Sequence, residues 1–294
     1  MAAYILRTLA VGEHYLSVTF QTAGSERRST PGAVAAIYRE RMTVVDVRHH
    51  EADYGFDGDY RAVSAPTVAT IVGTVSAGLL ASAARSLARG KPVAAAVTGG
   101  TGVSIVTTAA LFIRTTRVGK FEVWAEILDG LRLRGDETLL DLGCGRGAVL
   151  LAAAKLLPNG RAIGVDIWRA DQTDNSQQNT LRNAELEGVA DRVEVRTADI
   201  TDLPFDNDSV DVIVSSLVVH NIPSPEARAK AISEAARVLR PGRRLALVDI
   251  FNTNHYAQQL RELGWTDVRR RNLGWRMWWG PGMGTHVITA TKPA

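Results

Sequence analysis

Hydrophobic and polar positions divide the chain into three parts. Residues 1–65 are polar and show no apolar period, so we expect a poorly structured N-terminal extension there. Two long uncharged stretches follow, which predict a hydrophobic helical hairpin over residues 66–118. Residues 119–294 alternate strand-like and helix-like segments. That alternation predicts a doubly wound α/β domain with helices on both faces of a parallel sheet.

The predicted elements of this domain are short and regularly spaced. Strand-like segments cover residues 138–141, 162–166, 193–197, 210–215, 244–249, 267–272 and 285–291. Helix-like segments include residues 148–157, 176–187, 225–239 and 255–263. Pro-Asn-Gly at 158–160 and Pro-Gly at 241–242 mark turns that lead from a helix into the next strand.

The hairpin has the length of a membrane anchor but a weakly apolar composition. Residues 62–84 and 92–113 carry no charge, and Arg85, Arg89 and Lys91 lie between them. Each run can cross a hydrocarbon core of roughly 30 Å at about 1.5 Å per residue. The second run is mostly Ala, Gly, Ser and Thr, which favours insertion only marginally but allows close helix packing in a bilayer. We favour membrane association; the alternative is packing on the enzyme or on a second subunit, as in a homodimer.

Bulk composition narrows the function classes only a little. A formal net charge of +3 is a modest excess, more typical of solubility than of nucleic-acid binding. Cys144 is the single cysteine, so no internal disulfide forms, and this fits a reducing compartment. No secretory signal pattern is visible. Met42 begins a plausible start, and we hypothesise that residues 1–41 are an upstream extension and not native.

Residues 139–147 carry the strongest chemical signal. Apolar residues lead to Asp141, and Gly143, Gly145 and Gly147 then alternate with other residues as a helix begins. Glycines at this spacing let the backbone approach a ligand closely at the carboxyl end of a strand. A carboxylate before the first glycine repels a pyrophosphate but suits a ligand with an ammonium or sulfonium charge. This pattern argues against a dinucleotide.

Two further acidic residues end the next two predicted strands. Asp166 lies about 20 residues beyond Gly143, where a carboxylate can accept hydrogen bonds from ribose hydroxyls. Asp199 can accept from the exocyclic amine of adenine, while Ile167 and Ile200 can sandwich the ring. A single Asp at a strand end is usually a helix cap or a turn former. Three acidic residues at successive strand tips beside three glycines favour a nucleoside site.

Residues 121–294 resemble the class I S-adenosylmethionine-dependent methyltransferases. Residues 141–147 resemble the first motif of that family, 164–166 its second-strand acidic motif and 197–200 its adenine-contacting motif. The resemblance implies S-adenosylmethionine as cofactor, no metal, and a seven-stranded Rossmann-like sheet in the order 3-2-1-4-5-7-6 with the final strand antiparallel. The implied cofactor-binding residues are Asp141, Gly143, Cys144, Gly145, Gly147, Asp166, Ile167, Asp199, Ile200 and Ser215. We interpret Cys144 as a packing residue rather than a nucleophile.

The residues of these motifs most resemble the small-molecule branch of the family, which includes the ubiquinone and menaquinone C-methyltransferases. Residues 215–222 stand where that branch carries an Arg-Asn-Val-like segment, and this chain has His-Asn-Ile instead. The Asn/Asp-Pro-Pro-Tyr signature of many amino-methylating enzymes is absent from this position. His220 follows the fourth strand, where substrates of the family approach, and histidine suits a general base for a phenol, enol or amine. The alternative is a structural histidine bonded to a loop carbonyl.

Residues 269–279 concentrate arginine and tryptophan. They could stack nucleic-acid bases, anchor at a bilayer interface, or form an exposed strand beside the aromatic wall of a substrate pocket. We favour the last two. The sequence thus predicts a methyltransferase that acts on a small, apolar or lipid-like acceptor, with a cytoplasmic catalytic domain anchored at the cytoplasmic membrane. The alternatives are an RNA methyltransferase and a catalytically silent cofactor-binding subunit of a membrane assembly.

Overall fold

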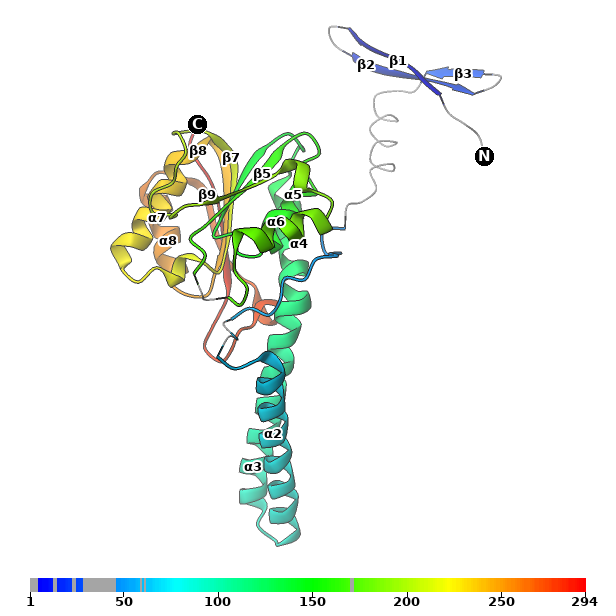
Figure 1. Ribbon diagram of the computed structural model, residues 1–294. Helices are drawn as coiled ribbons and strands as arrows, with labels where there is room; N and C mark the ends of the chain where they lie inside the picture. The colour runs from blue at the N-terminus through cyan, green and yellow to red at the C-terminus, as the bar shows by residue number, and fades with distance from the viewer. Residues whose placement is uncertain are drawn as a thin grey trace. The chain divides into compact units, whose positions relative to one another are not determined.

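The structure is a computed structural model that describes residues 5–12, 15–22, 25–28, 46–58, 60, 62–169 and 172–294. The chain divides into two compact units, residues 1–46 and 47–294. In the first unit, three antiparallel strands form a sheet in the order β1-β2-β3 (Figure 1). They are β1 (Ile5–Gly12), β2 (Tyr15–Thr22) and β3 (Ser25–Arg28).

These strands occur where the sequence analysis expected no regular structure. Leu16, Val18 and Phe20 alternate with polar residues in β2, which is the period of a strand. The alternation is short and lies in a polar stretch, so it does not predict a strand from sequence alone. Met42, the alternative start of the chain, lies outside the described residues.

A seven-stranded sheet forms the centre of the second unit. Its order is β6-β5-β4-β7-β8-β10-β9, and β10 is antiparallel to both neighbours. Numbered within the domain, this is 3-2-1-4-5-7-6, and the predicted order is confirmed. The strands are β4 (Thr138–Leu142), β5 (Arg161–Asp166), β6 (Val193–Thr197), β7 (Val210–Ser216), β8 (Leu239–Asp249), β9 (Thr266–Asn272) and β10 (His286–Thr291).

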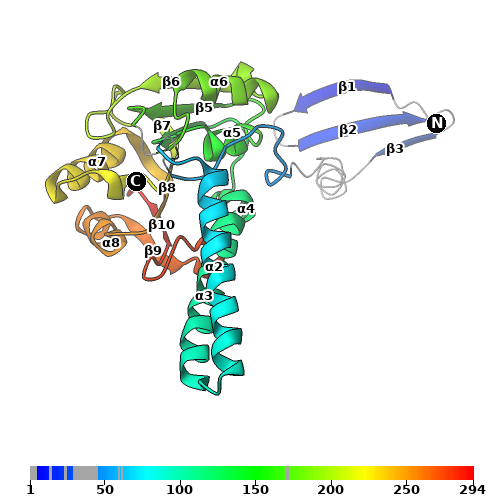
Figure 2. The ribbon, with the colours of Figure 1, turned by 60° about the horizontal axis from the view of Figure 1, so that its bottom comes forward.

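Helices cover both faces of this sheet (Figures 1 and 2). The side chains of Leu139 and Leu140 point to opposite faces, and each belongs to a different hydrophobic core. The first core contains side chains of α4 (Lys120–Leu131), α5 (Ala148–Ala154) and α6 (Gln177–Leu186); the second contains those of α7 (Pro225–Val238) and α8 (Thr253–Glu262). Short helical turns are η2 (Ala190–Arg192), η3 (Val219–Asn221) and η4 (Gly274–Met277).

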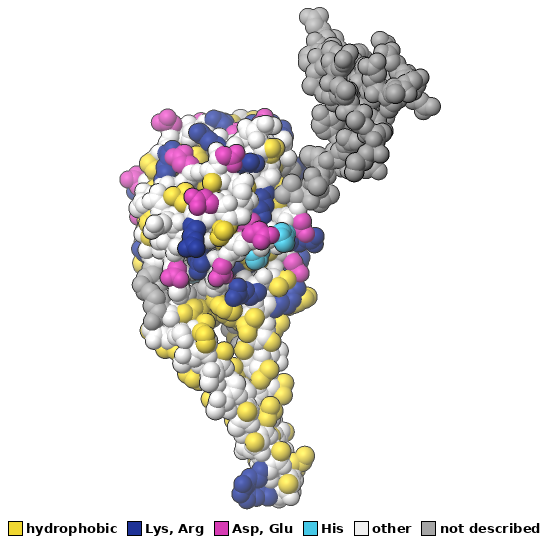
Figure 3. Space-filling view, turned by 45° about the vertical axis from the view of Figure 1, so that its right-hand side comes forward, with side chains coloured by type: hydrophobic (Ala, Val, Ile, Leu, Met, Phe, Trp, Pro, Cys, Tyr) yellow, Lys and Arg dark blue, Asp and Glu magenta, His cyan; other side chains and the backbone are white. Residues whose placement is uncertain are grey.

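The predicted hairpin consists of α2 (Ala65–Ala88) and α3 (Pro92–Arg114). Ser64 caps α2 by accepting a hydrogen bond from Thr67 N–H. The helices pack closely because small residues face the partner helix: a Cβ at Gly102 would lie 3.2 Å from Leu79 Cβ. Both are long and apolar enough to cross a membrane, by length and composition. Figure 3 shows hydrophobic side chains along the hairpin and cations at its tip.

The hairpin continues into the domain as one helix. After α3 the backbone makes a single π-helical turn, η1 (Thr115–Gly119), and then runs on as α4. Such turns are rare and occur often at functional sites. Gly119 is required here, because a Cβ at this position would lie 1.9 Å from the carbonyl oxygen of Arg276. The boundary predicted near residue 119 therefore falls within this turn.

Residues 47–58 pack against the domain rather than standing apart from it. Val47, Ala52 and Tyr54 are buried in the first hydrophobic core. Glu187 accepts hydrogen bonds from the Ala52 N–H and the Tyr54 hydroxyl, at 3.0 Å each. The interpretation of all 65 leading residues as a loose extension is thus wrong for this segment. Its buried side chains are too few and too irregularly spaced to produce a period.

Candidate functional site

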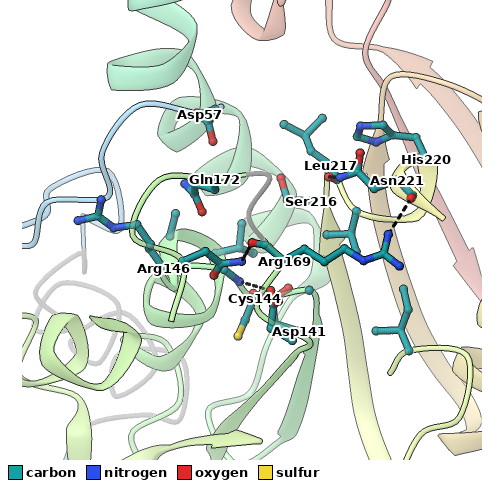
Figure 4. Close-up of a pocket in the computed structure, with 18 of the residues that line it drawn as sticks. Asp57, Asp141, Cys144, Arg146, Arg169, Gln172, Ser216, Leu217, His220 and Asn221 are labelled. Carbon is teal, nitrogen blue, oxygen red and sulfur yellow. Dashed lines mark hydrogen bonds between the residues drawn. The ribbon is translucent and has the colours of Figure 1, made fainter. Parts of the chain in front are cut away.

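A cavity of about 570 Å³ lies at the carboxyl ends of β4, β5, β6 and β7 (Figure 4). The structure brings most of the predicted site residues into its wall. They are Asp141, Gly143, Cys144, Gly145, Asp166, Ile167, Asp199, Ile200 and His220. Gly147 and Ser215 were also predicted, but they do not line the cavity.

Asp141 provides a buried polar group of the cavity that lacks a partner in the described part of the chain. Its residue is 1% exposed, and its Oδ1 has no hydrogen-bond partner among the described residues. Burial, together with the nearby charge of Asp166, raises the pKa of Asp141 to about 8. A buried carboxyl in this state needs a donor or a cation to complete it. The cavity is therefore suited to a ligand that carries a positive charge.

The glycines of the run have two different roles. Gly143 has φ +72°, and a Cβ there would lie 2.3 Å from Val218 Cγ2. Only glycine therefore fits between β4 and the loop after β7. Gly147 has φ +90°, and a Cβ would meet Leu151 and Thr180 at 3.0 and 3.1 Å. Gly147 thus permits the turn into α5 and its packing, and the prediction that it contacts the ligand is not supported by the cavity wall.

The two strand-tip carboxylates order their own loops while they line the cavity. Asp166 accepts hydrogen bonds from the N–H groups of Gly145 and Trp168, at 2.9 and 2.7 Å. Asp199 accepts from the N–H and hydroxyl of Thr201, at 2.8 and 2.9 Å. These bonds support the turn-forming interpretation, and the binding role of the two residues stays a prediction. The bond from Gly145 fixes the glycine turn against the second strand.

Ser215, which was predicted to bind the cofactor, does not line the cavity. The Ser215 hydroxyl is buried and donates to the Leu142 carbonyl, 2.8 Å away. Ser216 lines the cavity instead, and its hydroxyl accepts a hydrogen bond from Trp124 Nε1 at 3.0 Å. Neighbouring strand residues point to opposite faces, so an error of one position exchanges a structural residue for a lining residue.

Cys144 packs between the glycine turn and the sheet. It is 6% exposed, and a Cβ on Gly164 would lie 2.7 Å from its Sγ. Burial, followed by the charges of Asp141 and Asp166, raises the pKa of the Cys144 thiol. A thiol held in its neutral form is a poor nucleophile. These contacts agree with a packing role.

His220 forms a pair with a residue that the sequence analysis missed. Its Nδ1 lies 2.5 Å from Asp249 Oδ1, and its backbone N–H donates to Asp249 Oδ2 at 3.0 Å. Asp249 ends β8, is 1% exposed and also accepts from the Ile250 N–H at 2.8 Å. An apolar strand that ends in a carboxylate was a signal for this residue. The alternative bond to a loop carbonyl is not what the structure shows for Nδ1.

The remaining wall is largely apolar and comes from elements outside the predicted motifs. Phe112 of α3 and Trp279 pack edge to face, with ring centroids 5.9 Å apart. Trp124 of α4 and Met283 complete this part of the wall. An aromatic pocket wall was one of the two favoured interpretations of residues 269–279, and Trp279 does line the cavity. The sequence could not place Phe112, because a phenylalanine at the end of an apolar helix looks like any other core residue.

Asp57 joins the segment of residues 47–58 to the base of the hairpin beside the cavity. Asp57 accepts a hydrogen bond from Lys120 Nζ at 2.9 Å and another from the Thr116 hydroxyl. Asp57 and Lys120 both line the cavity (Figure 4 labels Asp57). Within the described ranges, no cluster of three or more His, Cys, Asp or Glu side chains could hold a metal ion.

Comparisons with known proteins point to one family. Residues 140–247 match the family profile described as "Methyltransferase domain". A ubiquinone/menaquinone biosynthesis C-methyltransferase of Roseobacter denitrificans is 31% identical over 48% of this chain and 54% of its own length. A demethylmenaquinone methyltransferase of Lactiplantibacillus plantarum is 33% identical over 40% of this chain and 47% of its own length. A solved S-adenosylmethionine-dependent methyltransferase from Aquifex aeolicus is 19% identical, covers 57% of this chain and 88% of that one, and has a TM-score of 0.46. The chain spans about half or less of the length of the curated relatives that it matches.

Proposed function

Because this chain carries a domain of the class I S-adenosylmethionine-dependent methyltransferases, we propose that it transfers a methyl group from that cofactor to a small, apolar or lipid-like acceptor. One observation carries the proposal. A buried carboxyl with an unpartnered oxygen, Asp141, lies in the same cavity as an apolar wall that includes Phe112 and Trp279. A cationic cofactor and an apolar acceptor would each meet a matching surface.

The residues of the cavity fit S-adenosylmethionine. Asp141 offers a carboxylate to a cationic group, and Asp166 lies where ribose hydroxyls would be bound. Ile167 and Ile200 would give apolar contact to an adenine ring, and Asp199 would offer an acceptor at its edge. When bound, the cofactor supplies an activated methyl group on a sulfonium, so the protein has mainly to align the acceptor.

His220 is proposed to act as the general base. A carboxylate can only accept a hydrogen bond, so the short contact with Asp249 places the ring proton on Nδ1. Nε2 then carries the lone pair and can take a proton from an O–H or N–H of the acceptor. Asp249 holds the ring orientation and stabilises the imidazolium that forms. It is a positioning residue because it does not line the cavity.

Apolar lining and relatives both support the acceptor class. Phe112, Trp124, Trp279 and Met283 present little polar surface to a bound molecule. Among the relatives, the proteins named for ubiquinone, menaquinone and demethylmenaquinone have quinone-type substrates in their names. A quinone-like or phenolic ring with an apolar substituent would satisfy both the wall and the base.

Two arginines of the C-terminal stretch, together with Arg114, are paired in ways that do not favour RNA as the acceptor. Arg271 and Arg276 share the carboxylate of Glu126, at 2.9 and 2.7 Å. Arg114 lies over the ring of Trp275, 4.2 Å from its centroid. These cations are therefore engaged within the protein. Nucleic-acid binding usually needs basic side chains that reach out to phosphates.

We further propose that the hairpin anchors the chain at the cytoplasmic face of a membrane. Val75, Val97 and Val103 are about half exposed or more, at 48%, 62% and 57%. The helices of 24 and 23 residues carry their cations near the ends. Exposed apolar surface of this extent on paired helices is stabilised by lipid rather than by water. The cofactor is cytosolic, so the catalytic domain would lie on that side.

A methyl-transfer assay tests the proposed function. Full-length protein in detergent micelles is incubated with S-adenosyl-[methyl-³H]methionine and, separately, an organic extract of membranes, total RNA and a water-soluble extract. We expect radioactivity in the organic-soluble product. Label in RNA would support the RNA methyltransferase instead. No transfer to any fraction, with the cofactor bound, would support a catalytically silent subunit.

A further inference from the structure

One helix, α3, contributes both to the wall of the cavity and to the exposed surface of the hairpin. Phe112 of α3 lines the cavity. The next residue, Ile113, is 48% exposed, and Val106 is 47% exposed less than two turns earlier. The apolar surface therefore continues from the hairpin to the cavity without an intervening charged residue in α3 before Arg114.

A loop from the C-terminal part of the domain lies beside Phe112 at the cavity wall. Trp279 packs against Phe112, and Met283 lines the cavity while it is 38% exposed. The Nε1 of Trp279 is buried and has no hydrogen-bond partner in the part of the chain that the structure describes. A bound molecule with a polar oxygen could complete that donor. We call Phe112, Trp279 and Met283 the apolar mouth.

The loop is fixed to the base of the hairpin. Trp278 N–H donates to Thr115 Oγ1 at 3.1 Å, and the Arg276 carbonyl packs on Gly119. The exposed ring of Trp275 lies beneath the Arg114 guanidinium. Tryptophan and arginine at the end of an apolar helix are typical of the membrane–water interface. These residues would place the apolar mouth at that depth.

Another part of the rim is closed by polar bonds. Val47, Tyr54, Asp57 and Gly58 line the cavity. Their segment is held by Glu187, and Arg146 Nη2 donates to the Asp53 carbonyl at 2.6 Å. Displacing this segment would break hydrogen bonds and ion pairs. Phe112 and Trp279 meet through ring contact, and parting them breaks no hydrogen bond between them. Rotating these two side chains, with the loop backbone still bonded to Thr115, would open the apolar mouth without breaking a hydrogen bond of either ring.

We propose that the apolar mouth opens at the boundary between lipid headgroups and acyl chains, and that the acceptor enters the site laterally from the bilayer. This inference rests on the proposed membrane anchoring of the hairpin. The partner is the lipid surface itself. The acceptor's reactive end would reach His220 while its apolar remainder passes between Phe112 and Trp279 toward the lipid.

Depth-dependent fluorescence quenching tests this placement. The single native cysteine is buried, so a thiol-reactive fluorophore can be directed to an introduced cysteine. We would label full-length Met283→Cys, with Asn159→Cys as the matched control. Asn159 is exposed in the turn before β5, at the opposite end of the sheet from the cavity. Both proteins are reconstituted in vesicles of phosphatidylcholine and phosphatidylglycerol, with a nitroxide lipid near the headgroup or with aqueous iodide as quencher.

The expected result separates the two proposals. The label at 283 should lie within roughly 10 Å of the headgroup–acyl boundary, so the nitroxide lipid quenches it strongly and iodide weakly. The label at 159 should show the reverse. If the protein stays with the vesicles but both labels respond only to iodide, the anchor is supported and the lateral route is overturned. If the protein stays in the bottom fraction and does not float with the vesicles, the anchoring proposal itself fails and the lateral route fails with it.

Discussion

His220 Nδ1 and Asp249 Oδ1 lie 2.5 Å apart, and the two residues come from the loop after β7 and the end of β8. The carboxylate is buried and also receives the backbone N–H groups of His220 and Ile250. This arrangement fixes the orientation of the ring. With its proton on Nδ1, as proposed above, the imidazole carries its lone pair on Nε2.

Asp249→Asn and His220→Ala should each lower kcat by about 10² or more, because proton transfer by a positioned base contributes about 10²–10⁴-fold. The KM for S-adenosylmethionine should change little in either variant. Steady-state kinetics measures both quantities. His255→Ala, an exposed histidine of α8, is the control and should behave as wild type. Full turnover by His220→Ala would contradict the base role.

Asp141 should couple cofactor binding to proton release. Its pKa of about 8 in the ligand-free protein means that it is mostly protonated at neutral pH. A bound cation favours the carboxylate, so binding releases a proton, and affinity should rise by up to about tenfold per pH unit toward pH 8. Calorimetry in buffers of different ionisation enthalpy measures the released proton. In Asp141→Asn the release should disappear and the affinity at pH 8 should fall.

The same pKa shift predicts a pH-dependent stability difference. Because the folded-state pKa of Asp141 is raised above its ordinary value of 3.8, the folded state binds the proton more tightly. Wild type should therefore lose stability relative to Asp141→Asn as pH rises from about 4 to about 8, by at most about 1.4 kcal/mol per unit. Thermal unfolding of both proteins in the same micelles across this range is the measurement. Asp129→Asn, an exposed residue of α4, should show no such trend relative to wild type.

Glu187 should control the segment of residues 47–58. Although burial opposes it, the hydrogen bonds from Lys155, Ala52 and Tyr54 hold the pKa of Glu187 below its ordinary value of 4.5. This contribution is present above the unfolded pKa and is lost as pH falls through the lower folded value. Glu187→Gln should destabilise the segment by roughly 3 kcal/mol, because a buried ion pair with Lys155 is broken.

Hydrogen–deuterium exchange over residues 47–58 measures this effect. Exchange should accelerate in Glu187→Gln at neutral pH and in wild type as acidification below its ordinary pKa of 4.5 protonates Glu187. Glu185→Gln lies two positions away on the exposed side of α6 and should exchange as wild type. Unchanged protection in Glu187→Gln would show that the segment is held by other contacts.

Two glycines of the same continuous helix should respond in opposite directions to alanine. Gly119→Ala forces a methyl against the Arg276 carbonyl and should cost about 1–3 kcal/mol or more. Gly130→Ala meets no heavy atom within 4 Å and should stabilise the protein by about 0.5–1 kcal/mol through helix propensity. The shift of the unfolding midpoint measures both. Equal midpoints would mean that the 274–279 loop does not rest on Gly119.

The sheet and the proposed cofactor side of the cavity could be predicted from the sequence, because both depend on patterns among residues close together in the chain. Glycine spacing and carboxylates at strand tips are read directly along the chain, and Asp141, Asp166 and Asp199 indeed converge on one cavity. Within a strand, the alternation of side chains between the two faces then decided which single residue lines the cavity. Ser215 and Ser216 differ by one step in β7, and the pattern gave no way to choose between them.

The proposed acceptor side of the cavity could not be predicted from sequence patterns, because it is built from distant segments. Phe112, Trp279 and Asp57 come from the hairpin, the C-terminal loop and the N-terminal segment, and they meet only in three dimensions. Asp249 is a similar case, since its importance lies in its contact with His220. A strand-end carboxylate was visible in the sequence, but its partner was not.

The central claim is that the cavity around Asp141 and Asp166 binds S-adenosylmethionine. Calorimetric titration of the full-length protein with S-adenosylhomocysteine, the product form of the cofactor, tests it most directly. We predict saturable binding with one ligand per chain, lost in Asp166→Ala and retained in the control Asp191→Ala, which alters an exposed residue before β6. Absence of binding to the folded wild type, or equal binding by Asp166→Ala, would contradict the account.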